Sequence, residues 1–214
     1  KIYVPNPDYG TRIELFKFYS NKIKLDENVN EKTISNLMSG NCAADIKNLI
    51  NEAVKYARKK KIYPVNMDCF DEAYDKIYMG HEGSVENVND LEQKIVLYHE
   101  AGHAIASLLL PDGDRVRKIT AIPRGQALGM VSTISDDKSM LISKNKLMTK
   151  LKVFLAGRAA EEIIFGEDMI TSGASNDIEQ ATNIARTMYG RLGMSKDIGM
   201  VKVLNSQGEY DASP

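Results

Sequence analysis

Apolar residues recur every three to four positions along much of this chain, which is the spacing of one face of an α-helix. The clearest early segment has Ile46, Leu49 and Ile50 on one face, and 58–61 place positive charge at its C-terminal end, where it suits the helix dipole. Short polar loops separate it from its neighbours. Four helices are predicted in this part of the chain, at about 12–21, 34–38, 43–60 and 67–79.

The segment 80–89 is polar and contains Gly83, so the domain boundary is placed there, between 1–82 and 83–214. Beyond it, Asp90 is a fair N-cap for a long helix that Pro111 ends. The predicted fold is mainly α: a four-helix subdomain, then a mostly helical domain with a small β-sheet. The elements predicted in the second domain are helices at about 90–110, 143–165 and 176–192, with short strands at 117–122 and 128–134.

Composition narrows the class of protein without identifying it. Hydrophobic residues make up 43% of the 214 residues and charged residues 27%, as in soluble globular proteins. The net charge of −1 gives no global preference for nucleic acid or an anionic membrane. Cys42 and Cys69 form no metal-binding spacing and are expected to be reduced thiols. No apolar run approaches the roughly 20 residues that span a bilayer, and the opening residues resemble no signal peptide, so we expect a soluble piece of a longer chain.

The long predicted helix carries a HExxH motif at 99–103. Four residues at 3.6 per turn place His99 and His103 on one face, where both imidazoles can bind one metal ion. Glu100 lies one step around the helix and can serve as a general base toward water. The competing interpretation is a pair of core histidines satisfied without metal. The apolar flanks favour the metal, because a buried helix with three such polar groups needs a partner for them.

Gly102 has two interpretations, since glycine costs about 1 kcal/mol relative to alanine inside a helix. It is either tolerated or required for close approach by another backbone or a substrate.

A catalytic zinc usually takes three protein ligands, so the motif leaves one to be found. His81 is the remaining histidine, but it lies in the polar linker and is expected to be solvated. The better candidates are the pair Glu161 and Glu162, and Asp177 after the turn at 172–175. An exposed helix face would equally explain the pair, and a role in the first helical turn would explain Asp177. Spacing alone leaves the choice open.

Four motifs in order resemble the peptidase domain of the FtsH family of membrane-anchored AAA metalloproteases. They are HEAGH at 99–103, ITAIPRG at 119–125, AGRAAEEIIFG at 156–166 and TSGASND at 171–177. The first 82 residues resemble the helical ATPase lid of that family, through Pro7-Asp8, Ala44-Asp45 and 51–53. The resemblance covers nearly the whole chain, although the domain's usual C-terminal helices are expected to be cut short after Gly208.

The resemblance implies a zinc site of His99, His103 and Asp177, with Glu100 as the catalytic base. Glu161 then becomes the runner-up ligand, or a group that orients a histidine. The resemblance further implies that Gly129, Met130, Val131 and Ser132 form an edge strand that binds substrate by main-chain pairing. An ordinary core strand would give the same pattern at 129–132.

The function implied by the resemblance is ATP-dependent zinc endopeptidase activity on unfolded or membrane-extracted proteins. The resemblance also implies a homo-hexamer, with the membrane anchor and the ATP- and Mg²⁺-binding core outside this chain, which has no GxxxxGK[ST] loop and is not expected to hydrolyse ATP. The expected membrane is a bacterial plasma membrane or a mitochondrial or plastid inner membrane, with no nucleic-acid partner. Two alternatives are an assembly module with a structural metal, which needs no base such as Glu100, and a nucleotide-binding regulatory fragment.

Overall fold

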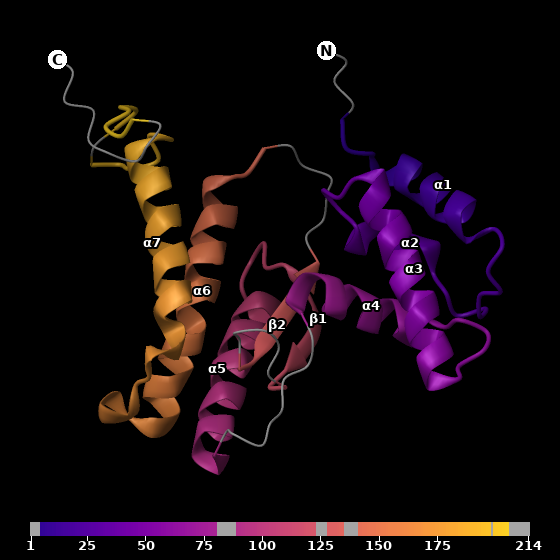
Figure 1. Cartoon of the computed structure of the whole chain (residues 1–214). Helices are drawn as coiled ribbons and strands as arrows, with labels where there is room; N and C mark the ends of the chain where they lie inside the picture. The colour runs from indigo at the N-terminus through magenta and orange to yellow at the C-terminus, as the bar shows by residue number, and fades with distance from the viewer. Residues whose placement is uncertain (1–4, 81–88, 123–127, 135–140, 198, 206–214) are drawn as a thin grey trace. The chain divides into compact units, whose positions relative to one another are not determined.

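The computed structural model describes residues 5–80, 89–122, 128–134, 141–197 and 199–205 (Figure 1). The chain forms two compact units. The first contains the four helices up to Met79, and the second contains the later helices and nearly all of the sheet. The boundary at 82/83 falls among residues outside the described ranges and stays a prediction, as does the solvated position of His81.

The first unit is a four-helix domain around one apolar core. Phe16 and Phe70 meet edge to face in this core, with ring centroids 5.6 Å apart, and Leu49 is fully buried beside them in the same cluster. Burying such side chains is the main favourable term in forming a domain of this size. The four helices are α1 (Tyr9–Ser20), α2 (Glu31–Leu37), α3 (Ala43–Lys60) and α4 (Met67–Met79).

The first two helices begin three residues earlier than the apolar pattern predicts. The Asp8 carboxylate accepts a hydrogen bond from the backbone N–H of Thr11 at 2.8 Å, which starts α1 at Tyr9. The Asn30 side chain caps α2 in the same way. Polar side chains that satisfy the free N–H groups of a first turn extend a helix beyond its apolar positions.

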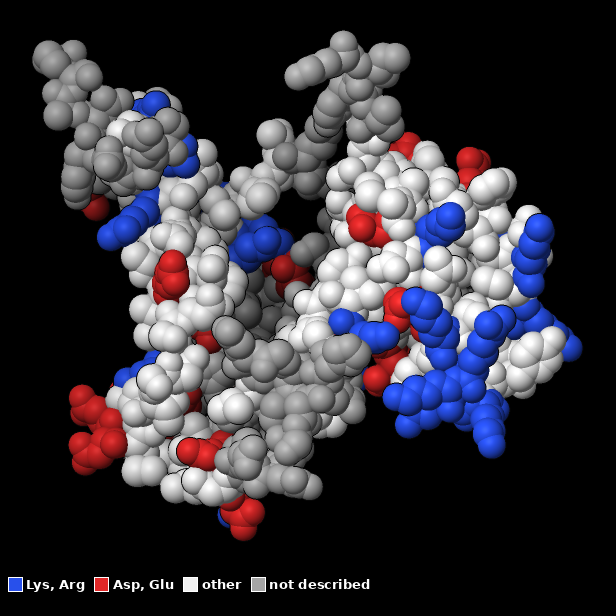
Figure 2. All heavy atoms as spheres, in the orientation of Figure 1, with Lys and Arg blue, Asp and Glu red and all other residues white. Residues whose placement is uncertain are grey.

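Positive charge gathers on the first unit near the end of α3 (Figure 2). The last turn of that helix carries Arg58, Lys59 and Lys60. Cations at this position interact favourably with the negative end of the helix dipole.

The second unit is built on a pair of long helices and a two-stranded sheet. Its first helix is capped by Asn89, whose side chain accepts from the N–H of Glu92 while the Glu92 carboxylate accepts from the N–H of Asn89. The prediction of Asp90 as the cap was therefore wrong by one residue, because this capping box holds the start of the helix. The elements are α5 (Asp90–Leu109), β1 (Arg115–Thr120), β2 (Met130–Ile134), α6 (Lys144–Phe165) and α7 (Ser175–Gly190), with 3₁₀ turns at Glu167–Met169 and Ser172–Ala174.

The prediction of a mainly α chain with a small sheet is confirmed by these elements. The turn predicted at 172–175 is a 3₁₀ turn that leads directly into α7. Among the described helices, none is long and apolar enough to cross a bilayer.

Gly102 lets α5 and α6 approach each other closely. A Cβ built at Gly102 would lie 2.5 Å from the carbonyl oxygen of Ala156 and 2.8 Å from the Cβ of Ala160. Both atoms belong to α6, and one is backbone, so neither can turn aside. Of the two interpretations of this glycine, the structure supports close approach by another backbone.

We therefore predict that Gly102→Ala destabilises the chain although alanine is the better helix former. Because the contact is with a backbone atom, we expect a cost near the upper end of the usual range for overpacking, about 1–3 kcal/mol, which exceeds the gain in helix propensity of about 1 kcal/mol. The melting temperature should fall by roughly 2–4 °C for each kcal/mol lost in a chain of this size. Gly10→Ala is the matched control, because its Cβ would meet nothing closer than the Asp8 carboxylate at 3.7 Å. Equal melting temperatures for the Gly102 variant and the unaltered chain would contradict the packing argument.

Candidate metal centre

The HExxH segment lies in the middle of α5, where its three polar side chains are buried. His99, Glu100 and His103 are 8%, 8% and 9% exposed. Helical spacing brings the Nε2 atoms of the two histidines to 3.0 Å from each other. The local sequence thus brings two of the three candidate metal ligands together on one face of α5.

The second nitrogen of each imidazole is held by α6. Nδ1 of His103 lies 2.7 Å from the carbonyl oxygen of Val153, and Nδ1 of His99 lies 2.6 Å from the Glu161 carboxylate. A carbonyl oxygen can only accept, so Nδ1 of His103 carries the hydrogen and donates it. The Glu161 carboxylate also accepts from its other neighbours, which assigns the donor role to His99 in the same way. In the neutral rings both Nε2 atoms are therefore left with free lone pairs.

Asp177 supplies the third group that faces this point. It lies in the first turn of α7, and its Oδ2 is 3.1 Å from Nε2 of His99 and 3.3 Å from Nε2 of His103. Burial alone would raise the pKa of the Asp177 carboxyl, but the two histidines, when protonated, lower it to about 2 through hydrogen bonds and charge. The carboxylate is accordingly ionised at neutral pH. Its side chain is directed at the histidines rather than at the helix start.

Three groups that can donate an electron pair thus converge on one small space, an arrangement suited to a cation. Burial acts to lower the pKa of His99, yet its bonds to Asp177 and Glu161 raise it overall, so the site favours positive charge. The ligand atoms that His99, His103 and Asp177 offer all lie within 4.8 Å of one another. Tetrahedral zinc with bonds of about 2.0–2.1 Å separates its ligand atoms by about 3.3 Å, close to the distances between these three groups. The donor set therefore fits zinc. It favours a metal site over the alternative of core histidines satisfied without a cation.

Glu161 lies behind His99 rather than among the converging donors. Its Oε1 faces Nδ1 of His99, while its Oε2 accepts from both the backbone N–H of Thr171 at 2.9 Å and the Thr171 hydroxyl at 3.1 Å. The residue is only 1% exposed, so an exposed-face interpretation is wrong for Glu161, whereas Glu162 is exposed and pairs with Arg158. In this position the Glu161 carboxylate can orient the His99 imidazole.

Glu100 lies beside the start of β2. Burial raises the pKa of the Glu100 carboxyl, which the charges of His103 and His99 and a hydrogen bond from the backbone of Val131 partly oppose. A Cβ built at Gly129 would lie 2.5 Å from Cγ1 of Val96 and 2.9 Å from a Glu100 carboxylate oxygen, so a larger residue there would require these side chains to shift. The raised pKa makes this carboxylate a stronger base than an exposed glutamate.

The segment predicted to bind substrate, 129–132, therefore borders Glu100, the predicted base. Met130, Val131 and Ser132 lie in β2, and Gly129 directly precedes it. The Ser132 hydroxyl is buried and accepts from Nε of Arg117 on β1, so this side chain is used within the sheet.

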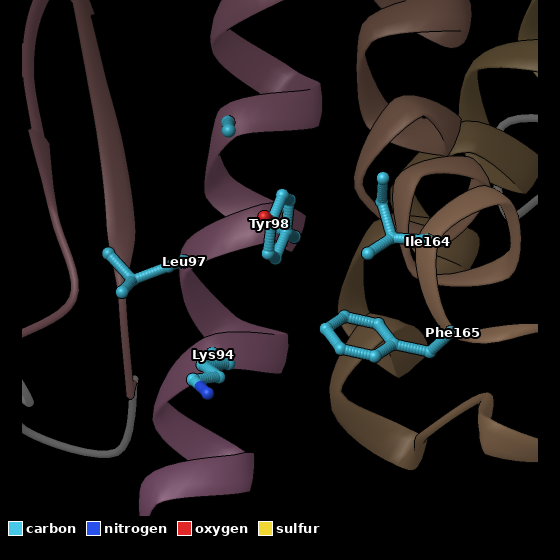
Figure 3. A pocket seen from close by; sticks show the side chains of 6 residues that line it. Lys94, Leu97, Tyr98, Ile164 and Phe165 are labelled. Atoms are coloured by element: carbon cyan, nitrogen blue, oxygen red, sulfur yellow. The ribbon is translucent and has the colours of Figure 1, made fainter.

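A hollow with a largely apolar lining lies along α5 and α6, separate from the three converging groups (Figure 3). Its volume is about 540 Å³, and the rings of Tyr98 and Phe165 meet edge to face at its side. None of its six lining residues is a histidine or a carboxylate, which separates it from the metal centre. They are Lys94, Leu97, Tyr98, Ala101, Ile164 and Phe165.

Two contributors to the site were not identified from the sequence, namely Val153 and Thr171. Val153 acts through its backbone carbonyl. Every residue type has such a carbonyl, so the sequence carries no signal for this contact. Thr171 has a weak signal, because a threonine before Ser172-Gly173 commonly bonds to nearby backbone, as its Oγ1 does here to the N–H of Gly173. Its bond to Glu161 follows only from the packing of the 3₁₀ turn against α6.

Comparison with known proteins gives one family. The family model described as Peptidase family M41 matches residues 86–213. Curated relatives include an ATP-dependent zinc metalloprotease FtsH of Rubrobacter xylanophilus, 40% identical over 209 residues, which are 98% of this chain and 32% of that protein. Proteins of the same name from Caulobacter vibrioides and Thermotoga maritima are also 40% identical, over 98% and 93% of this chain and 33% and 32% of their own lengths. The chain spans about a third of the length of these relatives.

Proposed function

Because the chain belongs to peptidase family M41, we propose that it carries the catalytic site of an ATP-dependent zinc endopeptidase. The observation that carries the proposal is the convergence of His99, His103 and Asp177, whose lone pairs face one another across about 3 Å. These three residues would hold the metal. Such a centre placed beside a buried carboxylate is suited to hydrolysis.

A zinc ion held there would supply a Lewis acid that polarises a peptide carbonyl and lowers the pKa of a water molecule. Glu100 accepts the proton of the attacking water and then donates it to the leaving amine. Its burial favours the first step, because a carboxylate whose pKa is raised is a stronger base toward water. Glu161 and the Val153 carbonyl fix the two imidazoles from behind, so that Nε2 of each stays directed at the centre.

The substrate in this proposal is an extended polypeptide. The segment 129–132 borders Glu100, and main-chain pairing along β2 would hold a peptide there with little demand on its sequence. Unfolded or membrane-extracted proteins present such extended chains. The rest of the proposal concerns the whole protein: a homo-hexamer, anchored in a bacterial plasma membrane or an organellar inner membrane, that uses ATP and Mg²⁺ in a preceding domain.

The four helices of the first unit are proposed to be the ATPase lid of that protein. This proposal is supported by the relatives, whose similarity extends over 98% of this chain and so includes these four helices.

The test is zinc content and casein cleavage by the 214-residue chain, before and after chelation. We expect about one zinc per chain, loss of cleavage after treatment with a chelator, and recovery when zinc is added back. Casein is suitable because it is unfolded and needs no ATP-driven unfolding. Cleavage that persists in metal-free protein would exclude the zinc mechanism, and a folded chain that binds no zinc would exclude the site itself.

A further inference from the structure

One face of α6 lies against both histidines. Val153, Gly157 and Glu161 are spaced by four residues and therefore share this face. The carbonyl of Val153 holds Nδ1 of His103, and the carboxylate of Glu161 holds Nδ1 of His99. Gly157 is midway between these two contacts, where a side chain would point at the rings.

The space that Gly157 leaves open is the space beside the metal-facing nitrogens. A Cβ built at this position would lie 2.5 Å from Nε2 of His103 and 2.6 Å from Nε2 of His99. It would also lie 2.7 Å from Cε1 of His99. These contacts are about 1 Å shorter than ordinary van der Waals contact of about 3.5 Å. A single methyl group would thus collide with the two atoms that the proposed function assigns to the metal.

Neither ring can move aside without losing its orientation. Each imidazole is held at Nδ1 by an atom of α6, so turning a ring away from residue 157 breaks that contact. Moving α6 outward instead would carry Val153 and Glu161 with it. It would also open the crossing at Gly102, where α5 and α6 are in close contact.

We propose that Gly157 is a positioning residue of the metal centre: the absence of its side chain keeps both Nε2 atoms free to face one ion. This inference rests on the proposed function for the identity of the ion. The space itself is a property of the chain without metal. An ordinary helix-packing glycine would lower stability when replaced but would act independently of the two histidines.

The first experiment measures the affinity of Gly157→Ala for Zn²⁺, by competition with a chromophoric chelator, and the visible spectrum of the Co²⁺-loaded chain. We expect affinity weaker by roughly 10–100-fold, the range seen when groups that orient metal-bound histidines are altered. The Co²⁺ spectrum should also change, because its intensity reports coordination geometry. Unchanged affinity together with an unchanged Co²⁺ spectrum would overturn the proposal. Gly10→Ala, whose Cβ meets no close atom, is the matched control and should behave as the unaltered chain.

The second experiment needs no metal and covers a Gly157 variant that folds poorly. The melting temperature of the metal-free chain is measured for four forms: the unaltered chain, Gly157→Ala, the double variant His99→Ala with His103→Ala, and the variant that combines all three substitutions. If the methyl group collides with the imidazoles, the loss caused by Gly157→Ala should disappear once both rings are removed. A loss of equal size with and without the rings would overturn the proposal. An unaltered chain that binds no zinc would instead defeat the proposed function, while this comparison still decides the role of Gly157.

Discussion

Replacing Glu100 by glutamine is expected to lower casein cleavage by about 10²–10⁴-fold, the usual contribution of a general base, while zinc content stays unchanged. The carboxylate is not among the three groups that converge on the metal position. Glutamine has nearly the same shape, so it should fit the confined space between α5 and Gly129. It has no basic oxygen comparable to a carboxylate and cannot take a proton from water. The measurement is cleavage rate together with zinc per chain.

The matched control for this variant is Glu162→Gln. Glu162 on α6 carries the same carboxylate but is exposed. Among the ion pairs of the described residues, it contacts only Arg158. Its replacement should leave both zinc content and cleavage as they are. Cleavage retained by Glu100→Gln would remove Glu100 from the role of base, whatever the control does.

Asp177→Asn is expected to lose both zinc and cleavage, and it gives the second large effect. The neutral amide removes the negative charge that lies 3.1 Å and 3.3 Å from the two Nε2 atoms, and a pKa of about 2 means that the aspartate carries this charge at neutral pH. Asparagine is close in size, so the substitution changes the ligand chemistry with little change in packing. Zinc per chain after dialysis and the rate of casein cleavage are the two measurements.

Glu161→Gln is the comparison that makes this result specific. It should still bind zinc, although with affinity weaker by about 10–100-fold, because Glu161 orients His99 and does not face the metal position. If Glu161→Gln loses the metal while Asp177→Asn keeps it, the assignment of the third ligand is wrong. The two carboxylates would then exchange roles in the site.

The family assignment rests on four ordered motifs, and it is confirmed by the match to Peptidase family M41 over residues 86–213. The helices at 43–60 and 67–79 begin and end as the apolar pattern predicts. The roles of the site residues, the domain boundary and the identity of the first unit as an ATPase lid remain predictions for the experiments above.

The sequence by itself determined the part of the site that depends on one helix. The separation of four residues fixes His99 and His103 on one face of α5, and Glu100 follows them around the turn, whatever surrounds the helix. Helical periodicity is a local property, so residue types and spacing are enough to predict it. The same reasoning explains why α3 and α4 were predicted well and the first residues of α1 and α2 less well, since the caps Asp8 and Asn30 lie outside the apolar pattern.

Only the tertiary structure decided which groups meet those histidines. Glu161 and Asp177 are 62 and 78 residues from His99, and nothing in their spacing distinguishes a buried partner from an exposed acid. The packing of α6 against α5 places Glu161 behind the ring, and the start of α7 brings Asp177 to its open side. The role of Gly157 follows from the same contact, because a missing side chain has an effect only where another element fills the space. Such contacts depend on how helices distant in sequence pack, which local patterns do not encode.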